Sequence, residues 1–497
     1  MLNIEKIKKY NQKKIWYFRF KKFDNSKYLV TNDIWRYIFL NENDFWKFIA
    51  WEIKVWELYE ELDNKWFLIN DSYKNTSAIA YANKNHFLAF WPVLHIVVLT
   101  LRCNHKCKYC HASAWNENSE NLDMSLDIAS KTLDTILHTS SNKISIEFQW
   151  GEPLLNWEVL KYFVEQWRYK AHLLKKSINF ALVSNLTLMD DDKLKFLIEN
   201  WVWISTSLDW DESLHNSNRL WTNWNSFEVV SKWIKKINDE YSVKWLKDLN
   251  GNTMSVWVLL TITKKSLSKY KEIIDTYIKL WITWIFLRIL NPYWFADVWK
   301  ENLWYTHSEF IEFYKKCLDY IIELNIQWIK IRELFTSIYL TKILAPRDPN
   351  FLDERSPCWA CIWQLAYNYD WKIYTCDEWR MLWRMGINDF EVITIGNEAK
   401  ENYRKIFDSE LTKSMVQAST LDWLPWYNDD VYKPYIWVCP IFNFKQSWNI
   451  YPNYSIDTRR KVSVSILDYI FEKLQDEKSK NIFENWLWTK NSDIKCI

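Results

Sequence analysis

Short apolar runs alternate with longer amphipathic segments from residue 93 to about residue 324. In residues 125–139, for example, Ile128, Leu133 and Ile136 recur at helical spacing, and Ser125 is a candidate N-cap. Buried strands are predicted at 93–101, 144–149, 178–184, 202–208, 256–263 and 284–290, and helices at 125–139, 157–174, 190–199, 226–238, 267–280 and 307–324. Six such β–α units predict an α/β fold with parallel strands, and they are too few for a closed eight-stranded barrel.

The segments that flank this alternation predict further units. Residues 1–85 combine β-like runs with helices, and the resulting α+β domain resembles winged-helix modules that bind leader peptides; a plain packing subdomain is the alternative. The polar residues 71–92 predict a linker, and the three prolines of 344–357 mark a boundary. We therefore expect an N-terminal domain at 1–85, a core at 90–343, a cysteine-bearing domain at 344–450 and a helical tail at 451–497.

The charge, the hydrophobic runs and the cysteine content argue against a nucleic-acid-binding, a membrane-spanning or a secreted protein. The formal net charge is only +2, so nothing favours nucleic acid as a partner. The longest apolar run, 93–101, is too short to span a membrane, and residues 1–14 lack the apolar stretch of a signal peptide. Nine cysteines in such a chain favour metal ligation over disulfides, and we expect a reducing cytoplasmic setting.

Tryptophan and glycine occur in unusual numbers. The chain has 36 Trp and 4 Gly, whereas an average chain of this length has roughly 35 glycines. Trp210 and Trp371 stand in predicted turns and Trp150 in a loop after a strand, where glycine is favoured because it adopts positive φ. We hypothesise that UGA codons, which mean glycine in the source lineage, are translated here as Trp. A genuinely Trp-rich protein is the alternative, and no aromatic nucleic-acid surface is inferred from this content.

Residues 101–114, LRCNHKCKYCHASA, carry Cys103, Cys107 and Cys110 just past the first predicted strand. Three thiolates can hold three irons of a [4Fe–4S] cluster and leave the fourth iron open for a small molecule. Zinc sites mostly use paired ligands with a second pair elsewhere, so zinc or unrelated cysteines are the weaker alternatives. The motif therefore indicates an iron–sulfur site at the carboxyl ends of the strands, where the sites of parallel β–α folds form.

This motif resembles that of the radical S-adenosylmethionine (SAM) enzymes. Residues 149–153, QWGEP, resemble the family's Gly-Gly-Glu-Pro loop, with Trp150 at the first glycine. The resemblance implies a partial (β/α)6 TIM-type barrel and a [4Fe–4S] cluster that binds SAM and yields a 5′-deoxyadenosyl radical. It also implies that SAM is contacted by Tyr109, Gly151, Glu152, Ser184, Asn185, Ser207 and Asp209. For the last four residues, capping of strand ends is an equal alternative.

The C-terminal cysteines resemble a SPASM domain, which holds auxiliary iron–sulfur clusters. Cys361 and Cys376 fit its C-x9-15-G-x4-C pattern if Trp371 stands for glycine. The resemblance implies one auxiliary [4Fe–4S] cluster, held by Cys358, Cys361, Cys376 and Cys439; zinc on the same residues is the alternative.

The family's second auxiliary site is expected to be lost. Tyr427, Asp430 and Ile436 stand at three of the positions where the family has cysteine. Of the remaining cysteines, Cys317 and Cys496 are expected to be buried or free thiols.

Longer strings, among them NDIWRYIFL and QLAYNYDWKIYTCDEWRM, resemble the radical SAM maturase of the His-Xaa-Ser repeat system. This resemblance implies a peptide or protein substrate, such as a His-Xaa-Ser repeat protein, and an electron donor such as flavodoxin or ferredoxin. Asp377 follows Cys376, where anaerobic sulfatase-maturing enzymes have a base that removes a substrate proton; a carboxylate held near the cluster is the alternative. The alternative functions are a formylglycine-generating sulfatase maturase and a non-catalytic iron–sulfur or zinc scaffold.

Overall fold

The computed structural model describes residues 14–23, 26–69, 73–89, 92–112, 114–209, 211–223, 225–244, 246, 254–291, 296, 300–349, 351, 354–383 and 391–487. An eight-stranded sheet lies at its centre, in the order β12-β10-β9-β8-β4-β15-β16-β17. The strands from the core are parallel and comprise β4 (Leu94–Val97), β8 (Lys143–Phe148), β9 (Ser177–Val183), β10 (Val202–Ser207) and β12 (Trp257–Leu259). This arrangement confirms the predicted α/β fold with a parallel core.

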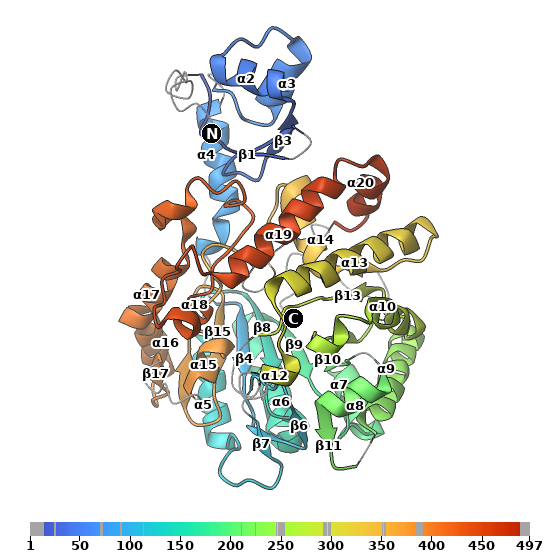
Figure 1. Ribbon diagram of the computed structural model, residues 1–497. Helices are drawn as coiled ribbons and strands as arrows, with labels where there is room; N and C mark the ends of the chain where they lie inside the picture. Colours follow the sequence, from blue (N-terminus) through green and yellow to red (C-terminus); the bar gives the residue numbers. More distant parts are fainter. Residues whose placement is uncertain are drawn as a thin grey trace.

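Helices connect these strands and lie around the sheet (Figure 1). The Ser125 hydroxyl accepts a hydrogen bond from the Ile128 N–H at 3.3 Å, which confirms the predicted N-cap. The connecting helices are α5 (Leu126–Leu137), α6 (Trp157–Leu174), α7 (Asp191–Glu199), α8 (Glu212–Asn218), α9 (Ser226–Val243) and α10 (Tyr270–Lys279), with short 3-10 turns η2 (Pro153–Asn156) and η3 (Lys264–Ser266).

The sixth predicted strand differs from expectation. It is reduced to β13 (Trp284–Ile285), which pairs in parallel with β14 (Arg332–Glu333) and not with β12. The rings of Trp257 and Trp284 nevertheless lie 3.8 Å apart, so β12 and β13 are neighbours through their side chains. The open six-unit arrangement is therefore kept by packing at a point where the hydrogen-bonded sheet ends.

The cysteine-bearing segment extends the sheet at its other side. Strand β15 (Gln364–Tyr367) pairs in parallel with β4, and β16 (Lys372–Tyr374) and β17 (Ile393–Thr394) continue the sheet in antiparallel fashion. The other elements of this segment are α15 (Asp377–Trp383), α16 (Ala399–Asp408), α17 (Glu410–Ser419), η4 (Leu421–Trp423), η5 (Pro425–Tyr427) and α18 (Pro440–Ser447). The segment that we expected as a separate domain thus shares its sheet with the core.

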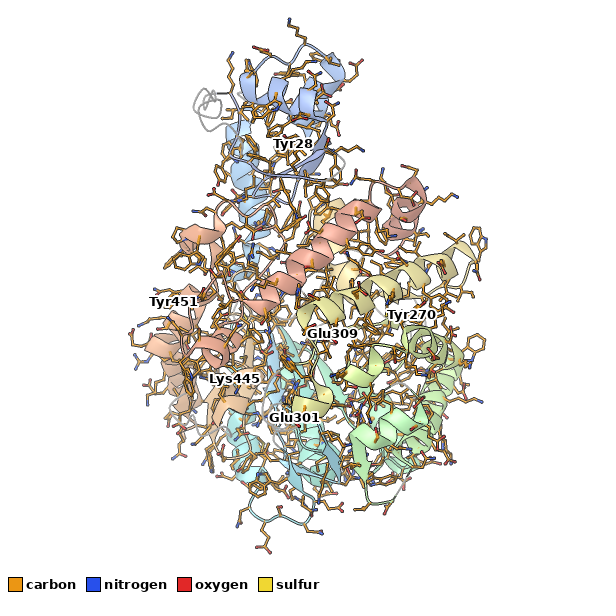
Figure 2. All side chains as sticks on the ribbon, viewed as in Figure 1. Tyr28, Tyr270, Glu301, Glu309, Lys445 and Tyr451 are labelled. Carbon is orange, nitrogen blue, oxygen red and sulfur yellow. The ribbon has the colours of Figure 1, made fainter. Side chains whose placement is uncertain are left out.

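The N-terminal unit stands apart from the sheet at the top of Figure 1. It has an antiparallel meander of β1 (Arg19–Lys22), β2 (Tyr28–Thr31) and β3 (Tyr37–Leu40), covered by α2 (Glu42–Ala50) and α3 (Trp56–Asn64). The ring of Tyr28 stacks on Phe45 at 4.0 Å inside this unit (Figure 2). The Thr31 hydroxyl donates to the Val431 carbonyl at 2.7 Å and so ties the unit to the C-terminal half.

The predicted linker is wrong in part, because residues 73–84 form helix α4 (Tyr73–Lys84), followed by η1 (His86–Ala89). The segment has no strong apolar stripe, and contacts distant in sequence hold it. Lys84 Nζ donates to the Asp33 carbonyl at 2.6 Å, and the Tyr81 hydroxyl donates to the Asp422 carboxylate at 2.8 Å. Such contacts leave no signal in local periodicity.

The predicted helical tail contains α19 (Thr458–Lys473) and α20 (Glu477–Glu484). Helix α19 packs on α13 (His307–Ile326) and α14 (Leu334–Leu344), and the short α12 (Lys300–Leu303) precedes them. Cys496 lies outside the described residues, and Cys317 is fully buried in α13. Among the described residues, no helix combines the length and the apolar character that crossing a bilayer requires.

Tryptophan occupies most of the positions with left-handed backbone. Among the described residues, fifteen non-glycine residues have positive φ, and nine of them are Trp, namely Trp35, Trp51, Trp66, Trp150, Trp201, Trp281, Trp328, Trp371 and Trp448. Trp371 has φ 72° in the turn between β15 and β16, while Trp210 lies outside the described residues. The left-handed region suits glycine and disfavours any residue with a Cβ, so this distribution supports the recoding hypothesis.

Helix ends give the most regular examples. After α10, the Trp281 N–H donates to the Ile278 carbonyl and the Ile282 N–H donates to the Tyr277 carbonyl, both at 3.0 Å. These two bonds make a Schellman motif, whose left-handed residue is usually glycine. Trp328 and Trp66 end α13 and α3 in the same way, and the Trp281 and Trp328 side chains are 85% and 88% exposed. Tryptophan gains no burial at 281 or 328 that would offset the backbone strain.

We predict that the protein isolated from its source carries glycine at 281 and 328, which peptide mass spectrometry checks directly. In the chain as given, Trp281→Gly and Trp328→Gly should each raise the free energy of unfolding by about 1 kcal/mol, because strain is removed and no core contact is lost. Trp167 is the matched control: it is fully buried in α6, has no positive φ, and its replacement by Gly should destabilise by about 3 kcal/mol or more. Tryptophan at 281 and 328 in the source protein would refute the hypothesis.

Candidate active site

One cavity of about 320 Å³ brings the two groups of cysteines together. Cys103, Cys107 and Cys110 line one part of it, and Cys358 and Cys376 line another. The first group lies beyond the C-terminal end of β4, whereas Cys358 precedes β15 and Cys376 follows the antiparallel β16, so these two lie at the N-terminal end of β15. Because β15 pairs in parallel with β4, one cavity extends from one group to the other. Two cysteine motifs more than 240 residues apart in sequence therefore belong to one site.

The first cysteine group lies on a compact loop that contains β5 (Arg102–Cys103) and β6 (His105–Cys107), with β7 (Trp115–Asn116) paired to β5 and β11 (Arg219–Trp221) paired to β6. The Cys110 N–H donates to the Cys107 carbonyl at 3.1 Å, and the His105 N–H points to Cys103 Sγ at 3.4 Å. Burial raises the pKa of Cys107 to about 12 and that of Cys103 well above its usual range. These thiols therefore need a bound cation to ionise, and the three-thiolate donor set fits three irons of a [4Fe–4S] cluster.

The loop after β8 lies directly against the cysteine loop. Gly151 has φ 60°, and a Cβ at this position would lie 2.4 Å from the Thr100 carbonyl oxygen and 2.7 Å from that of Arg102. The Glu152 N–H donates to the same Arg102 carbonyl at 2.8 Å. Only glycine fits at 151, and the two loops are held as one unit. Trp150, with φ 73°, also lines the cavity, and its indole N–H is buried without a partner in the described residues.

Glu152 is fully buried beneath this loop, outside the cavity lining. Its carboxylate accepts hydrogen bonds from the Ser184 hydroxyl and the Asn185 N–H, both at 2.8 Å, and from the Leu154 N–H at 3.1 Å. Burial raises its pKa to about 7 despite these donors. Ser184 and Asn185 do line the cavity. Glu152 therefore holds these two residues in place through hydrogen bonds and acts as a positioning residue.

Tyr109 lines the cavity, and a hydrogen bond to Asp209, which lies outside the cavity lining, orients its ring. The Tyr109 hydroxyl donates to the Asp209 carboxylate, which also faces the Arg219 guanidinium at 3.6 Å. Asp209 is fully buried and lies outside the lining, whereas Ser207 is part of it. Arg219, which the sequence analysis missed, lines the cavity beside Tyr109 and supplies a cation that can pair with a ligand carboxylate.

The second cysteine group is buried under α15, α17 and α18. Cys358, Cys376 and Cys439 share an apolar cluster. Burial raises the pKa of the Cys376 thiol well above its usual range, and the nearby acids and the thiols of Cys358 and Cys439 raise it further. The Cys361 N–H donates to the Thr375 carbonyl at 3.1 Å, which places Cys361 next to Cys376, and its thiol lies 3.3 Å from the Thr412 hydroxyl. Cys358, Cys376 and Cys439 thus lie together and fit three ligands of an iron–sulfur cluster, whereas the Cys361 thiol is engaged with Thr412.

Zinc on the same thiols is the alternative to an iron–sulfur cluster, because four thiolates also suit tetrahedral zinc. In the described part of the chain, the possible ligand atoms of Cys376, Asp377 and Glu378 lie within 4.8 Å of one another. Chemical analysis for iron and zinc distinguishes the two.

Side chains fill the region of the second auxiliary site. Asp430 accepts from Arg460 Nε at 2.8 Å, and the Tyr427 hydroxyl donates to the Asp457 carboxylate at 3.2 Å. Tyr427 and Ile436 are at most 2% exposed. The positions that lack cysteine thus take part in an ion pair and in core packing.

Three carboxyl groups line the cavity, those of Glu147, Asp377 and Glu378. Asp377 accepts a hydrogen bond from the Gln364 amide at 2.7 Å, which orients it. Glu147, on β8, also lines the cavity and is only 5% exposed. Burial, reinforced by the charge of Asp377, raises the pKa of Glu147 to about 8. The sequence analysis missed Glu147, although an acid inside an apolar strand was a usable signal.

Glu147 should make stability depend on pH. Its folded pKa of about 8 exceeds the ordinary value of 4.5, so the folded state binds the proton more tightly. Its contribution is complete below about pH 4.5 and is lost as the pH rises towards 8. Relative to Glu147→Gln, wild-type unfolding free energy should fall with rising pH by at most about 1.4 kcal/mol per unit. Urea denaturation at both ends of this range measures the difference, and a constant difference would contradict the burial argument.

Comparison with known proteins gives a consistent family. Residues 97–276 match the model of the Radical SAM superfamily. The chain is 25% identical over 299 residues to a cysteine-type anaerobic sulfatase-maturating enzyme of Clostridium perfringens, covering 57% of this chain and 74% of that protein. It is 22% identical over 158 residues to the radical SAM cyclopropyl synthase TigE of Paramaledivibacter caminithermalis, covering 29% and 33% of the two chains.

A solved structure shows the same fold. The structure of anSMEcpe with bound AdoMet and a Cp18Cys peptide matches with a TM-score of 0.60 and 16% identity, over 79% of this chain and 99% of that chain. Family model and fold agree with the cysteine motif and with the loop that lies against it. Residues 97–276 are therefore similar to the Radical SAM superfamily, the chain has the α/β fold of the anSMEcpe structure, and its sequence is similar to that of an anaerobic sulfatase-maturating enzyme.

Proposed function

We propose that the chain is a radical SAM maturase that modifies a peptide or protein substrate, specifically one of the His-Xaa-Ser repeat system. The observation that carries the proposal is the shared cavity, which is lined by Cys103, Cys107 and Cys110 and also by Cys358, Cys376 and Asp377. A non-catalytic scaffold would have no need for an acid and a SAM-type loop in the same enclosed space.

The chain's own residues supply binding and orientation. Cys103, Cys107 and Cys110 would hold a [4Fe–4S] cluster, which when reduced supplies the electron that cleaves SAM to a 5′-deoxyadenosyl radical. Gly151 lets the loop backbone approach the site, and Ser184, Asn185 and Ser207 offer polar groups to a bound nucleoside. Tyr109 offers an aromatic face, and Arg219 can pair with the carboxylate of a bound amino acid.

In this proposal, the second cysteine group and Asp377 act on the substrate, by accepting an electron and a proton from it. Cys358, Cys361, Cys376 and Cys439 would hold one auxiliary [4Fe–4S] cluster, which can take up an electron from the oxidised substrate. Asp377 is held by Gln364 and is placed to accept a substrate proton. A flavodoxin or ferredoxin would provide reducing equivalents. A cytoplasmic setting is part of the proposal, and none of the eight described cysteines is in a disulfide.

A sulfatase-type maturase that forms formylglycine is the second candidate. The aspartate directly after a buried cysteine and the similarity to the Clostridium perfringens enzyme favour it. The two candidates share the SAM chemistry and differ only in the peptide that is modified. Incubation with a His-Xaa-Ser repeat peptide and with a sulfatase peptide, followed by mass spectrometry, separates them.

We predict that the anaerobically reconstituted chain forms 5′-deoxyadenosine from SAM. Replacement of Cys103, Cys107 and Cys110 by Ala should abolish product formation, because no ligand remains for the SAM-binding cluster. Cys317→Ala is the matched control, since this buried thiol lies in α13 away from both groups, and it should keep the activity. Deoxyadenosine formation by the triple variant, measured by chromatography, would refute the assignment.

We predict a total of about eight iron atoms per chain, four for each cluster. Cys376→Ala combined with Cys439→Ala should lower the count to about four while SAM reductive cleavage without substrate continues. Chemical iron analysis with parallel zinc analysis makes the measurement. About twelve irons would mean that the second auxiliary site is rebuilt from other ligands, and zinc in place of four irons would support the zinc alternative.

A further inference from the structure

Glu147 has a buried carboxyl oxygen without a hydrogen-bond partner among the described residues, unlike the buried acids Glu152 and Glu333. Its side chain is 5% exposed and lines the cavity, and Oε2 has no hydrogen-bond partner among the described residues. Glu152, five residues further on, accepts three hydrogen bonds. Glu333 is also fully buried and accepts from the Leu287 and Thr336 N–H groups and the Tyr314 hydroxyl. The residue that carries this oxygen lines the cavity, where a ligand can reach it.

Among the described residues, no ion pair of Glu147 is recorded. Strand pairing places Ile96 of β4 and Ala181 of β9 beside it. The charged group that acts on its pKa is Asp377, which has the same sign. The two arginines that line the cavity are Arg219, which faces Asp209 at 3.6 Å, and Arg288, and neither acts on the pKa of Glu147. A ligand that enters this part of the cavity thus meets a carboxyl with free hydrogen-bonding capacity.

A buried carboxyl oxygen that has no hydrogen-bond donor destabilises the folded protein. Such a group is explained when a bound ligand supplies the missing donor. A neutral donor would supply a hydrogen bond but no charge, whereas a basic group supplies both. The pKa of about 8 adds support, since a protonated carboxyl can pass its proton to a neutral imidazole, or release it to solvent when an ammonium group binds.

We propose that Glu147 is a specificity-determining residue that recognises a basic side chain of the substrate, an imidazole or an amine, on the inner wall of the cavity. The inference rests on the proposed function, because it assumes that a peptide enters this space. The cavity of about 320 Å³ holds one side chain of this size together with other groups. Asp377 and Glu147 then act on the same substrate segment, with Asp377 taking a proton and Glu147 holding the basic group.

Binding of three fluorescent peptides to the reconstituted protein with SAM present tests the proposal. The probes are four-repeat peptides of His-Ala-Ser, Lys-Ala-Ser and Gln-Ala-Ser, compared by fluorescence anisotropy under anaerobic conditions. At least one basic peptide should bind about tenfold more tightly than the Gln peptide, as expected for a charge-assisted hydrogen bond. The His and Lys probes distinguish imidazole from amine.

Glu147→Gln should remove the preference and leave binding of the Gln peptide unchanged. Glu158→Gln is the matched control, because Glu158 lies on α6 with its side chain 79% exposed, and it should bind all three peptides like the wild type. The visible absorbance of the clusters shows whether each variant is intact. If Glu147→Gln does not assemble, the comparison of the three peptides on the wild type still decides the matter.

Equal binding of all three peptides by the wild type would overturn the proposal, as would a preference that survives in Glu147→Gln. Formation of 5′-deoxyadenosine by the same preparation separates this failure from a wider one. With that activity present and no basic preference, only the role of Glu147 is wrong. Without that activity, the proposed function itself fails.

Discussion

Strand β4 is the element on which the site depends, because both of its edges are hydrogen-bonded in parallel. β8 pairs along one edge and β15 along the other, over four residues in each case. The first pairing places the cysteine loop beside the Gly151 loop, and the second brings Cys358, Gln364 and Cys376 to the same cavity. Every later feature of the cavity, including the meeting of Asp377 with Glu147, follows from these two ladders.

Backbone conformation is the second constraint, and it acts where chains approach closely. Gly151 has less than 3 Å of room for a Cβ against two carbonyl oxygens of the cysteine loop, so the approach requires glycine there. The same left-handed geometry recurs at Trp150 one residue earlier and at helix ends such as Trp281. If these tryptophans are glycines in the source organism, the cavity beside the Gly151 loop is larger by one indole ring.

Local signals carried much of the fold. The five parallel strands, the Ser125 cap and the Gly151 loop could be predicted from the sequence. Each depends on residues that are close together in the chain, namely the alternation of apolar and amphipathic segments, the capping residue and the turn residues. The pairing of β15 with β4 could not, since it joins residues about 270 positions apart without a local signature. Glu147 and Arg219 were missed for the related reason that their importance comes from what the fold leaves beside them. Helix α4 was missed because hydrogen bonds to Asp33 and Asp422 hold it.

The central claim is that Cys103, Cys107 and Cys110 hold a cluster whose open iron binds SAM. Low-temperature electron paramagnetic resonance of the reduced, reconstituted chain, recorded with and without SAM, tests this most directly. We expect SAM to change the spectrum of one reduced cluster while a second signal stays constant, and we expect the triple Cys→Ala variant to retain only the constant signal. A wild-type spectrum that does not respond to SAM would contradict the account.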